Sequence, residues 1–522
     1  MSKRRSRFSY GATSARGALP RVDDLGVMKV ETGTMTEYSD EAPKQAKPMG
    51  RVNRKIMNTW MGWGTKVLPF ADVATPDLPL SRLLRLSLIQ VSVGMSLTLL
   101  VGTLNRVMIV ELNVPASLVG IMLALPLLFA PFRALIGHKS DTHQSALGWR
   151  RVPFIFRGTM IQFGGLAVMP FALLVLAKSM ESNLAPAWVG QLSAGIAFLL
   201  VGAGIHITQT VGLALATDLA PEEAQPNVVG LMYVMLLVGS IVSALLFGAF
   251  LVDFTPGRLI QVIQASAVVT VFLNFIALWK QETRKPSRLQ TAPPPPQLSF
   301  RESWDSFIAE NQAMRRLIAV GLGTLAFSME DILLEPYGGQ VLGLGVGATT
   351  KLTASFAGGS LVGFILASQI LSRGSDPFRM ASAGALVGFP GFLMVIGAAS
   401  TQSVPMFSIG VLLIGLGAGL FGHGTLTATM NFAPKNQVGM ALGAWGAVQA
   451  TAAGVGAAMG GILRDVVGRS SMTGPWPPVA MGYVTVYGLE LALLLATLVT
   501  MYPLLRTSRG GEASLPVRRL AE

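Results

Sequence analysis

The sequence predicts an all-α polytopic membrane protein with 12 transmembrane helices in two pseudo-symmetric six-helix halves. Of its 522 residues, 51% are hydrophobic and 13% are charged, whereas soluble domains carry about 25% charged residues. Glycines gather inside apolar runs such as residues 415–424, where close contact between membrane helices favours small residues. Twelve apolar runs are long enough to cross a bilayer, which takes roughly 20 helical residues.

The expected spans follow one another along the chain. In order, they lie at residues 84–110, 115–136, 153–177, 187–214, 227–252, 259–279, 315–334, 347–371, 380–400, 405–430, 438–463 and 479–504. Lysine and arginine are concentrated in every second loop, so the positive-inside rule places both termini in the cytoplasm. Topology and attraction to anionic membrane lipids account for the net charge of +13, and we therefore expect lipid contacts and no nucleic-acid partner.

The segments outside the spans complete the expected organisation. In chain order we expect a disordered basic cytoplasmic tail (1–50), an amphipathic interfacial helix with a linker (51–80), an N-terminal six-helix half (81–280), a proline-rich cytoplasmic linker (281–314), a C-terminal six-helix half (315–505) and a cytoplasmic tail (506–522). Apolar and basic residues at helical spacing predict the interfacial helix, and a flexible polar tail is the alternative. No apolar core follows the basic N-terminus, so we expect no cleavable signal peptide.

A weak internal repeat relates the two halves. The sequence ATDLAP (216–221) aligns with TMNFAP (429–434), and each stands at the cytoplasmic end of the fourth span of its half. A span that begins with glycine follows in both halves. Two six-helix halves related by an axis along the membrane normal describe the major facilitator architecture.

The loop after the second span offers candidates for a cytoplasmic lock. Residues 137–151 contain Asp141, Arg150 and Arg151 in a pattern of glycine, aspartate, glycine and two basic residues, which resembles the loop motif of facilitator proteins. A carboxylate at a helix end can bind both arginines and exposed backbone amides. We expect these residues to tie helix ends together by ion pairs, and an ordinary basic loop is the alternative.

Three carboxylates stand in the apolar stretch SMEDILLEPYGGQ (328–340). A buried carboxylate needs a partner or a proton, because burial in a membrane costs about 2.5–3.5 kcal/mol on insertion scales. We expect Glu330 and Asp331 to pair with Arg106 across the two halves and to close the periplasmic side. Glu335 is expected at the periplasmic interface, just before residues 336–339 break the helix. Solvated carboxylates at a helix end are the alternative.

Two histidines lie inside expected spans, where polar side chains are costly and face a protein interior rather than lipid. His206 and His423 occupy the fourth helix of their respective halves, which lines the central cavity in a facilitator fold. They are candidates for ligand binding, and a hydrogen bond to a neighbouring helix is the alternative for each.

Catalysis has no support in the sequence. The chain has no cysteine, which excludes thiol catalysis and thiolate metal sites, and no hydrolase or cofactor motif is evident. We therefore expect no enzyme. From the residues alone, a proton-coupled secondary transporter of a small solute, working through Glu330 or Asp331, is the leading hypothesis.

Five stretches together resemble a known family. They are LPFADVATPDLPLSRLLRLSLIQVSVGM (68–95), GTLNRVMIVEL (102–112), GHKSDTHQSALGWRRVPFI (137–155), GIHITQTVGLALATDLAP (204–221) and LLEPYGGQVLGLGVGATTKLT (333–353). They are similar to the bacteriochlorophyll delivery family, the PucC and LhaA type proteins of purple phototrophic bacteria. The resemblance implies a facilitator-like assembly factor for light-harvesting antenna complexes, which delivers bacteriochlorophyll as cargo to antenna α and β polypeptides. It also implies a bacterial inner, intracytoplasmic photosynthetic membrane, with pigment-biosynthesis enzymes as further partners.

This implied cargo gives the polar residues of the spans a role. The magnesium of a chlorophyll accepts an axial ligand such as imidazole, carboxylate or amide oxygen. His206 and His423 are the leading candidates for that ligand, with Gln209 and Glu330 behind them. No residue is expected to hold a metal ion directly.

Overall fold

The computed structural model describes most of the apolar part of the chain. The described residues are 78–128, 136, 139–140, 149–181, 186–221, 224–282, 308, 312–432, 438–470 and 476–512. The predicted N-terminal tail, the predicted interfacial helix up to residue 77, Asp141, most of the predicted 281–314 linker and the last ten residues lie outside this set. Every regular element within it is helical.

The helices account for the predicted spans. In the N-terminal half they are α2 (Leu80–Leu86), α3 (Leu88–Leu97), η2 (Thr98–Leu104), η3 (Val107–Glu111), α4 (Ala116–Leu128), α6 (Val152–Glu181), α7 (Ala187–Leu219), α8 (Gln225–Phe250) and α9 (Pro256–Leu278). In the C-terminal half they are α11 (Ala313–Ala326), η6 (Glu330–Ile332), α12 (Leu334–Gln340), α13 (Val346–Leu371), α14 (Pro377–Thr401), α15 (Val404–Phe432), α16 (Val438–Arg469) and α17 (Pro478–Glu512). Among the described residues, 11 helical stretches are long and apolar enough to cross a membrane, and α4 is a shorter apolar helix. The chain is a multi-pass membrane protein.

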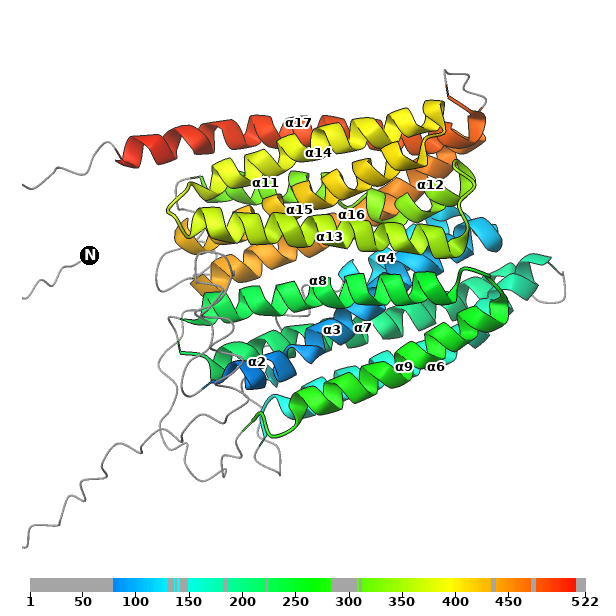
Figure 1. The fold of residues 1–522 in the computed structure, drawn as a ribbon, viewed down its shortest axis with the longest axis horizontal. Coiled ribbons are helices and arrows are strands. Elements are labelled where there is room, and N and C mark those ends of the chain that lie inside the picture. Colours follow the sequence, from blue (N-terminus) through cyan, green and yellow to red (C-terminus); the bar gives the residue numbers. More distant parts are fainter. Residues whose placement is uncertain are drawn as a thin grey trace, which may run out of the picture. The chain divides into compact units, whose positions relative to one another are not determined.

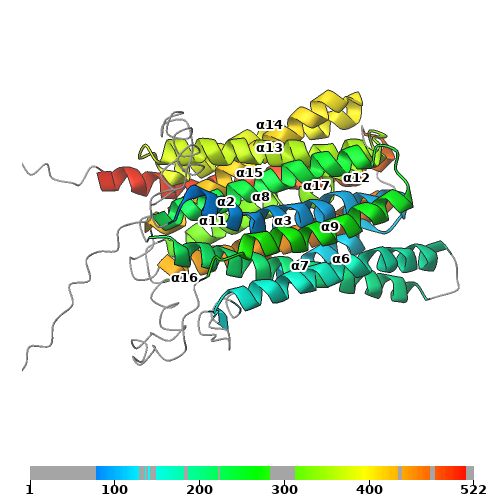
Figure 2. The same ribbon diagram turned by 60° about the horizontal axis from the view of Figure 1, so that its bottom comes forward.

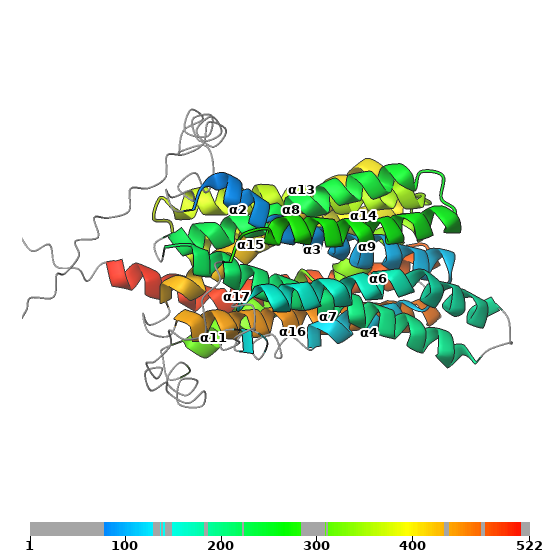
Figure 3. The same ribbon diagram turned by 90° about the horizontal axis from the view of Figure 1, so that it is seen from below.

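The long helices run side by side along one direction (Figure 1), and the same alignment is visible after a 60° turn (Figure 2). The helices of residues 80–278 gather on one side and those of residues 313–512 on the other. Two pairs of helices join these halves: α13 packs against α8, and α16 packs against α4 (Figure 3).

Glycines allow these two pairs to approach closely. A methyl group on Gly347 of α13 would lie 2.6 Å from the carbonyl oxygen of Gly248 of α8. A methyl group on Gly461 of α16 would overlap the carbonyl oxygen of Ala116 in α4. Small residues at a membrane helix interface bring the backbones together, so van der Waals contact holds the halves without a large apolar side chain between them.

The seventh span differs from its prediction. We predicted one helix over 315–334 that ends at residues 336–339, but α11 ends at Ala326 and a new helix, α12, begins at Leu334. Pro336 is the third residue of α12, in the first turn, where a missing N–H removes no helical hydrogen bond. Tyr337 anchors this helix, because its fully buried hydroxyl donates a 2.8 Å hydrogen bond to the carbonyl of Val395 in α14.

The first and last spans also differ from the helices that we expected. The first span is wound as π-helix over η2 and η3, a form that is rare and often marks functional sites. The last helix continues to Glu512, so residues 506–512, which we assigned to the cytoplasmic tail, are helical.

Candidate functional site

The halves are bonded to each other at one end. Residues 103–117 cover the end of the first span and the start of the second, residues 332–350 cover the end of the seventh and the start of the eighth, and Asp465 lies near the end of the eleventh. Since successive spans run in opposite directions, these segments share one end, which we call the joined end. Four hydrogen bonds between the halves lie here: Thr103 with Thr350 (3.4 Å), Asn105 to the Ile332 carbonyl (2.8 Å), Arg106 to the Leu344 carbonyl (3.0 Å) and the Ser117 amide to Asp465 (2.8 Å).

Arg106 takes part in this closure with a partner other than the predicted one. Its guanidinium, 4% exposed, forms a 2.5 Å ion pair with Glu111 of its own span. Its guanidinium also donates a hydrogen bond to the carbonyl of Leu344 in the other half. The predicted ion pair with Glu330 or Asp331 does not form within the described part of the chain, where the ion pair of Arg106 is with Glu111.

Glu335 is buried within the protein at the joined end. It is 3% exposed and accepts hydrogen bonds from Thr353 and, at 3.4 Å, from Thr350 of α13. Arg106 is near enough to interact with it electrostatically. Of the three carboxylates that we singled out, Glu335 is thus the one that approaches Arg106. We expected residues 336–339 after it to break the helix, but they are part of the continuous helix α12.

The other two carboxylates, Glu330 and Asp331, form a group with Glu490 and Tyr487 that we call the acid cluster. Glu330 and Glu490 are 0% exposed, and none of their carboxylate oxygens has a hydrogen-bond partner in the described part of the chain. The Tyr487 hydroxyl is equally enclosed and unpartnered there. Electrostatic interactions connect Glu330 with Asp331 and Glu490. Sequence reasoning missed Glu490, although a lone carboxylate in the twelfth span was a signal for it.

Arg150 and Arg151 tie three helix ends together at the opposite end. Both guanidiniums pair with Asp218, the next-to-last residue of α7, at 2.5 and 2.9 Å. Glu282, which follows α9, accepts hydrogen bonds from the backbone amides of Arg150 (2.6 Å) and Val152 (3.0 Å) at the start of α6. A carboxylate at a helix N-terminus is favoured by the helix dipole. The predicted partner Asp141 lies outside the described residues, and Asp218 and Glu282 were not predicted.

The two histidines belong to separate parts of the bundle. His206 lies on α7, which packs against helices of the N-terminal half, and His423 lies on α15, which packs against α11, α13, α14 and α16. The His423 ring meets Phe364 of α13 at 4.2 Å between centroids, and Phe364 lies 6.3 Å from Tyr233 of α8. This aromatic row of Tyr233, Phe364 and His423 crosses from one half to the other. Gln209 lies on α7, close in sequence to His206.

The chain is similar over most of its length to proteins of one family. A family model described as PUCC protein matches residues 103–509. Protein PucC of Rhodovulum sulfidophilum is 63% identical over 420 residues, covering 80% of this chain and 92% of the relative. Protein PucC of Cereibacter sphaeroides is 58% identical over 445 residues, covering 85% and 96%. A more distant relative in Rhodobacter capsulatus, named bacteriochlorophyll synthase 44.5 kDa chain, is 29% identical over 395 residues, covering 74% and 88%.

Solved structures share the fold. A D-xylose–proton symporter superposes with a TM-score of 0.60 at 14% identity, covering 80% of this chain and 96% of that one. The nucleoside transporter NupG gives 0.56 at 12% identity, covering 81% and 100%. At such identities the likeness shows the fold alone, and it confirms the predicted facilitator architecture of two six-helix halves. The chain belongs to the PucC protein family and is built on the major facilitator fold.

Proposed function

We propose that this protein is an assembly factor for photosynthetic light-harvesting antenna complexes, which binds bacteriochlorophyll in the inner membrane of a purple bacterium and delivers it to antenna α and β polypeptides. Membership of the PucC family supports this proposal, as does the printed name of the distant relative, which refers to bacteriochlorophyll. The pigment is cargo and no bond is made or broken in it, so the protein acts as a carrier and not as an enzyme.

The aromatic row is the observation that carries the proposal. His423 is partly exposed, and its Nδ1 atom is buried without a hydrogen-bond partner among the described residues. An imidazole nitrogen is a suitable axial ligand for pigment magnesium, and the aromatic rings of Phe364 and Tyr233 beside it offer flat apolar faces. His423 is thus the preferred ligand, Phe364 and Tyr233 would contact the macrocycle, and a pigment held there would touch both halves.

The other pigment-ligand candidates are less well placed. Glu330 is enclosed within the C-terminal half at 0% exposure, so a macrocycle could reach it only after the surrounding helices moved apart. His206 and Gln209 are partly exposed on α7 but lie outside the aromatic row. They therefore serve as comparison sites in the test of His423.

Absorption spectroscopy of the protein purified in mild detergent from pigment-producing cells tests the proposal. We expect bacteriochlorophyll to copurify with the wild type, to be lost largely from His423→Ala and to be retained by the matched control His206→Ala. His423→Gln should retain part of the pigment with a shifted absorption band, because an amide oxygen can also bind magnesium. A colourless wild type, or equal pigment loss in both alanine variants with folding intact, would contradict the proposal.

Proton-coupled transport of a small solute is the second candidate, and the acid cluster favours it. Buried carboxylates within membrane spans commonly mark proton pathways, and the fold is that of solute transporters. In liposomes this function predicts solute-dependent acidification of the lumen, reported by an enclosed pH-sensitive dye, that Glu330→Gln abolishes. A lumen that stays at constant pH with every solute class tested would remove this candidate.

A further inference from the structure

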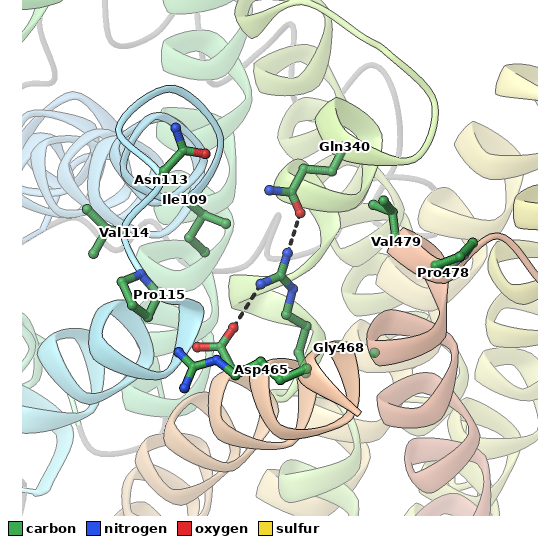
Figure 4. Close-up of a pocket in the computed structure, with 12 residues that line it drawn as sticks. Ile109, Asn113, Val114, Pro115, Gln340, Asp465, Gly468, Pro478 and Val479 are labelled. Carbon is green, nitrogen blue, oxygen red and sulfur yellow. Dashed lines mark hydrogen bonds and ion pairs between the residues drawn. The ribbon is translucent and has the colours of Figure 1, made fainter. Parts of the chain in front are cut away.

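A cavity of about 490 Å³ opens at the joined end, between the two halves (Figure 4). Residues 113–115 of the N-terminal half form one side, and Gln340 and the facing ends of α16 and α17 form the other. Its volume is within the range of small-molecule sites, about 300–1,000 Å³. None of the groups that we assigned to pigment binding or to the acid cluster lines it, so the cavity is independent of the proposed function.

Arg464 is held in a fixed position in the wall of this cavity. Its guanidinium donates to Asp465 at 2.8 Å and to the side-chain oxygen of Gln340, and the dashed lines of Figure 4 mark both bonds. It also lies 5.0 Å above the ring of Tyr483. Asp465 is fixed in turn by the backbone amide of Ser117. These two bonds use only two of the five N–H donors of the guanidinium, which leaves donor capacity for an occupant.

Arg469 gives the cavity its net charge. Asp465 is the one carboxylate in the lining, and its charge balances that of Arg464. Arg469, the exposed last residue of α16, also lines the cavity, and its side chain forms no ion pair or hydrogen bond within the described part of the chain. One positive charge therefore remains, which suits an anion with a single negative charge.

The remaining wall is apolar and lies where the spans end. Val114, Pro478 and Val479 contribute to it, and Val479 is 53% exposed at the mouth. The cavity lies between the last residue of α16 and the first turn of α17, and because these spans end there we expect it at the level of the membrane surface. Arginine is well suited to bind phosphate oxygens through paired N–H donors, and apolar side chains beside them suit the first carbons of an acyl chain.

We propose that this cavity binds an anionic phosphate group. The apolar wall favours the phosphodiester of an anionic phospholipid headgroup as its source, and soluble phosphate is the other source of the same chemistry. An occupant would contact residues 113–115 of one half and the arginines of the other.

Native mass spectrometry of the full chain in detergent tests this site with short-chain phosphatidylglycerol, short-chain phosphatidylcholine and inorganic phosphate as probes. We expect phosphatidylglycerol to bind more tightly than phosphatidylcholine. Arg469→Gln should weaken phosphatidylglycerol binding about tenfold, because one charge-assisted contact is lost. The matched control is Arg258→Gln, which removes an exposed arginine of the first turn of α9, outside the cavity and paired with Asp253, and it should leave binding unchanged.

A second variant tests whether a change of charge, rather than misfolding, weakens lipid binding. Val479→Glu places a negative charge at the exposed mouth and should weaken phosphatidylglycerol binding as Arg469→Gln does. Inorganic phosphate that binds and is lost in Arg469→Gln, without a preference between the two lipids, would support the site with a soluble source. The proposal is overturned if neither phosphatidylglycerol nor phosphate binds selectively, if neither variant weakens binding, or if Arg258→Gln weakens it equally.

Discussion

Tyr337 and Tyr487 are two fully buried phenols whose ring centroids lie 5.7 Å apart, and they differ in hydrogen bonding. Tyr337 donates to the Val395 carbonyl, whereas the Tyr487 hydroxyl has no partner among the described residues. We expect Tyr337→Phe to lower the free energy of unfolding by about 1 kcal/mol and Tyr487→Phe to leave it unchanged or to raise it. Denaturant titration in detergent measures both, and equal losses would contradict this assignment.

Arg151 supports a second prediction for single residues. Its guanidinium is 6% exposed and pairs with Asp218 at 2.9 Å, so Arg151→Gln should lower the free energy of unfolding by about 2 kcal/mol through loss of charge-assisted hydrogen bonds. Arg379→Gln is the control, since Arg379 is 52% exposed and 3.9 Å from Asp376, and should change stability by less than about 0.5 kcal/mol. A comparable loss in both variants, measured as thermal midpoints, would argue against a structural role for the Arg151 network.

Individual residues were the hardest part to predict. A single sequence shows that Arg106 and Glu330 need partners, because isolated charges in a membrane are costly, but it does not show which groups meet in space. Arg106 pairs with Glu111, five positions further along its own span, and the π-helical winding of η3 allows this spacing. Glu330 instead lies near enough to Glu490 of the last span for an electrostatic interaction, a proximity between segments far apart in the chain that no local pattern encodes.

Within elements, the glycines of α16 give a sharp test of close packing. Gly461 faces the backbone of α4, while a methyl group on Gly443 of the same helix would meet nothing within 4 Å. We expect Gly461→Val to destabilise the protein by about 1–3 kcal/mol through overpacking, and Gly443→Val to be tolerated. Thermal denaturation of the two purified variants makes the comparison. If Gly443→Val proved as harmful as Gly461→Val, helix propensity rather than contact with α4 would be the cause.

Whole spans were predictable because hydrophobic length is a property of contiguous residues. Each of the twelve expected spans overlaps a described helix. The interruption of the seventh span was predicted at the wrong place. Proline and two glycines at 336–339 are the usual signals of a break, so we expected the helix to end there. Tertiary packing overrode those signals, because Tyr337 is fixed among the rings of Phe407, Tyr483 and Tyr487 and stabilises α12 there.

For the molecule as a whole, the lack of cysteine permits a clean cross-linking test of the joined end. The Thr103 and Thr350 hydroxyls, one from each half, are 3.4 Å apart. We expect Thr103→Cys combined with Thr350→Cys to form an intramolecular disulfide under mild oxidation, seen as a reducible mobility shift, with each single variant as control. Failure of the double variant to cross-link in folded protein would show that the halves do not meet there.

The bonding of the two halves leads us to expect that they differ in mechanical stiffness. In the N-terminal half, Asp218 and Glu282 fasten the ends of α6, α7 and α9 to one another, so that these helices are braced as a unit. In the C-terminal half, the backbone between α11 and α12 leaves the regular helical path, and such irregular segments absorb rotation in domain motions. A load applied across the interface is therefore expected to bend the protein at residues 327–333, with the braced half acting as the rigid lever.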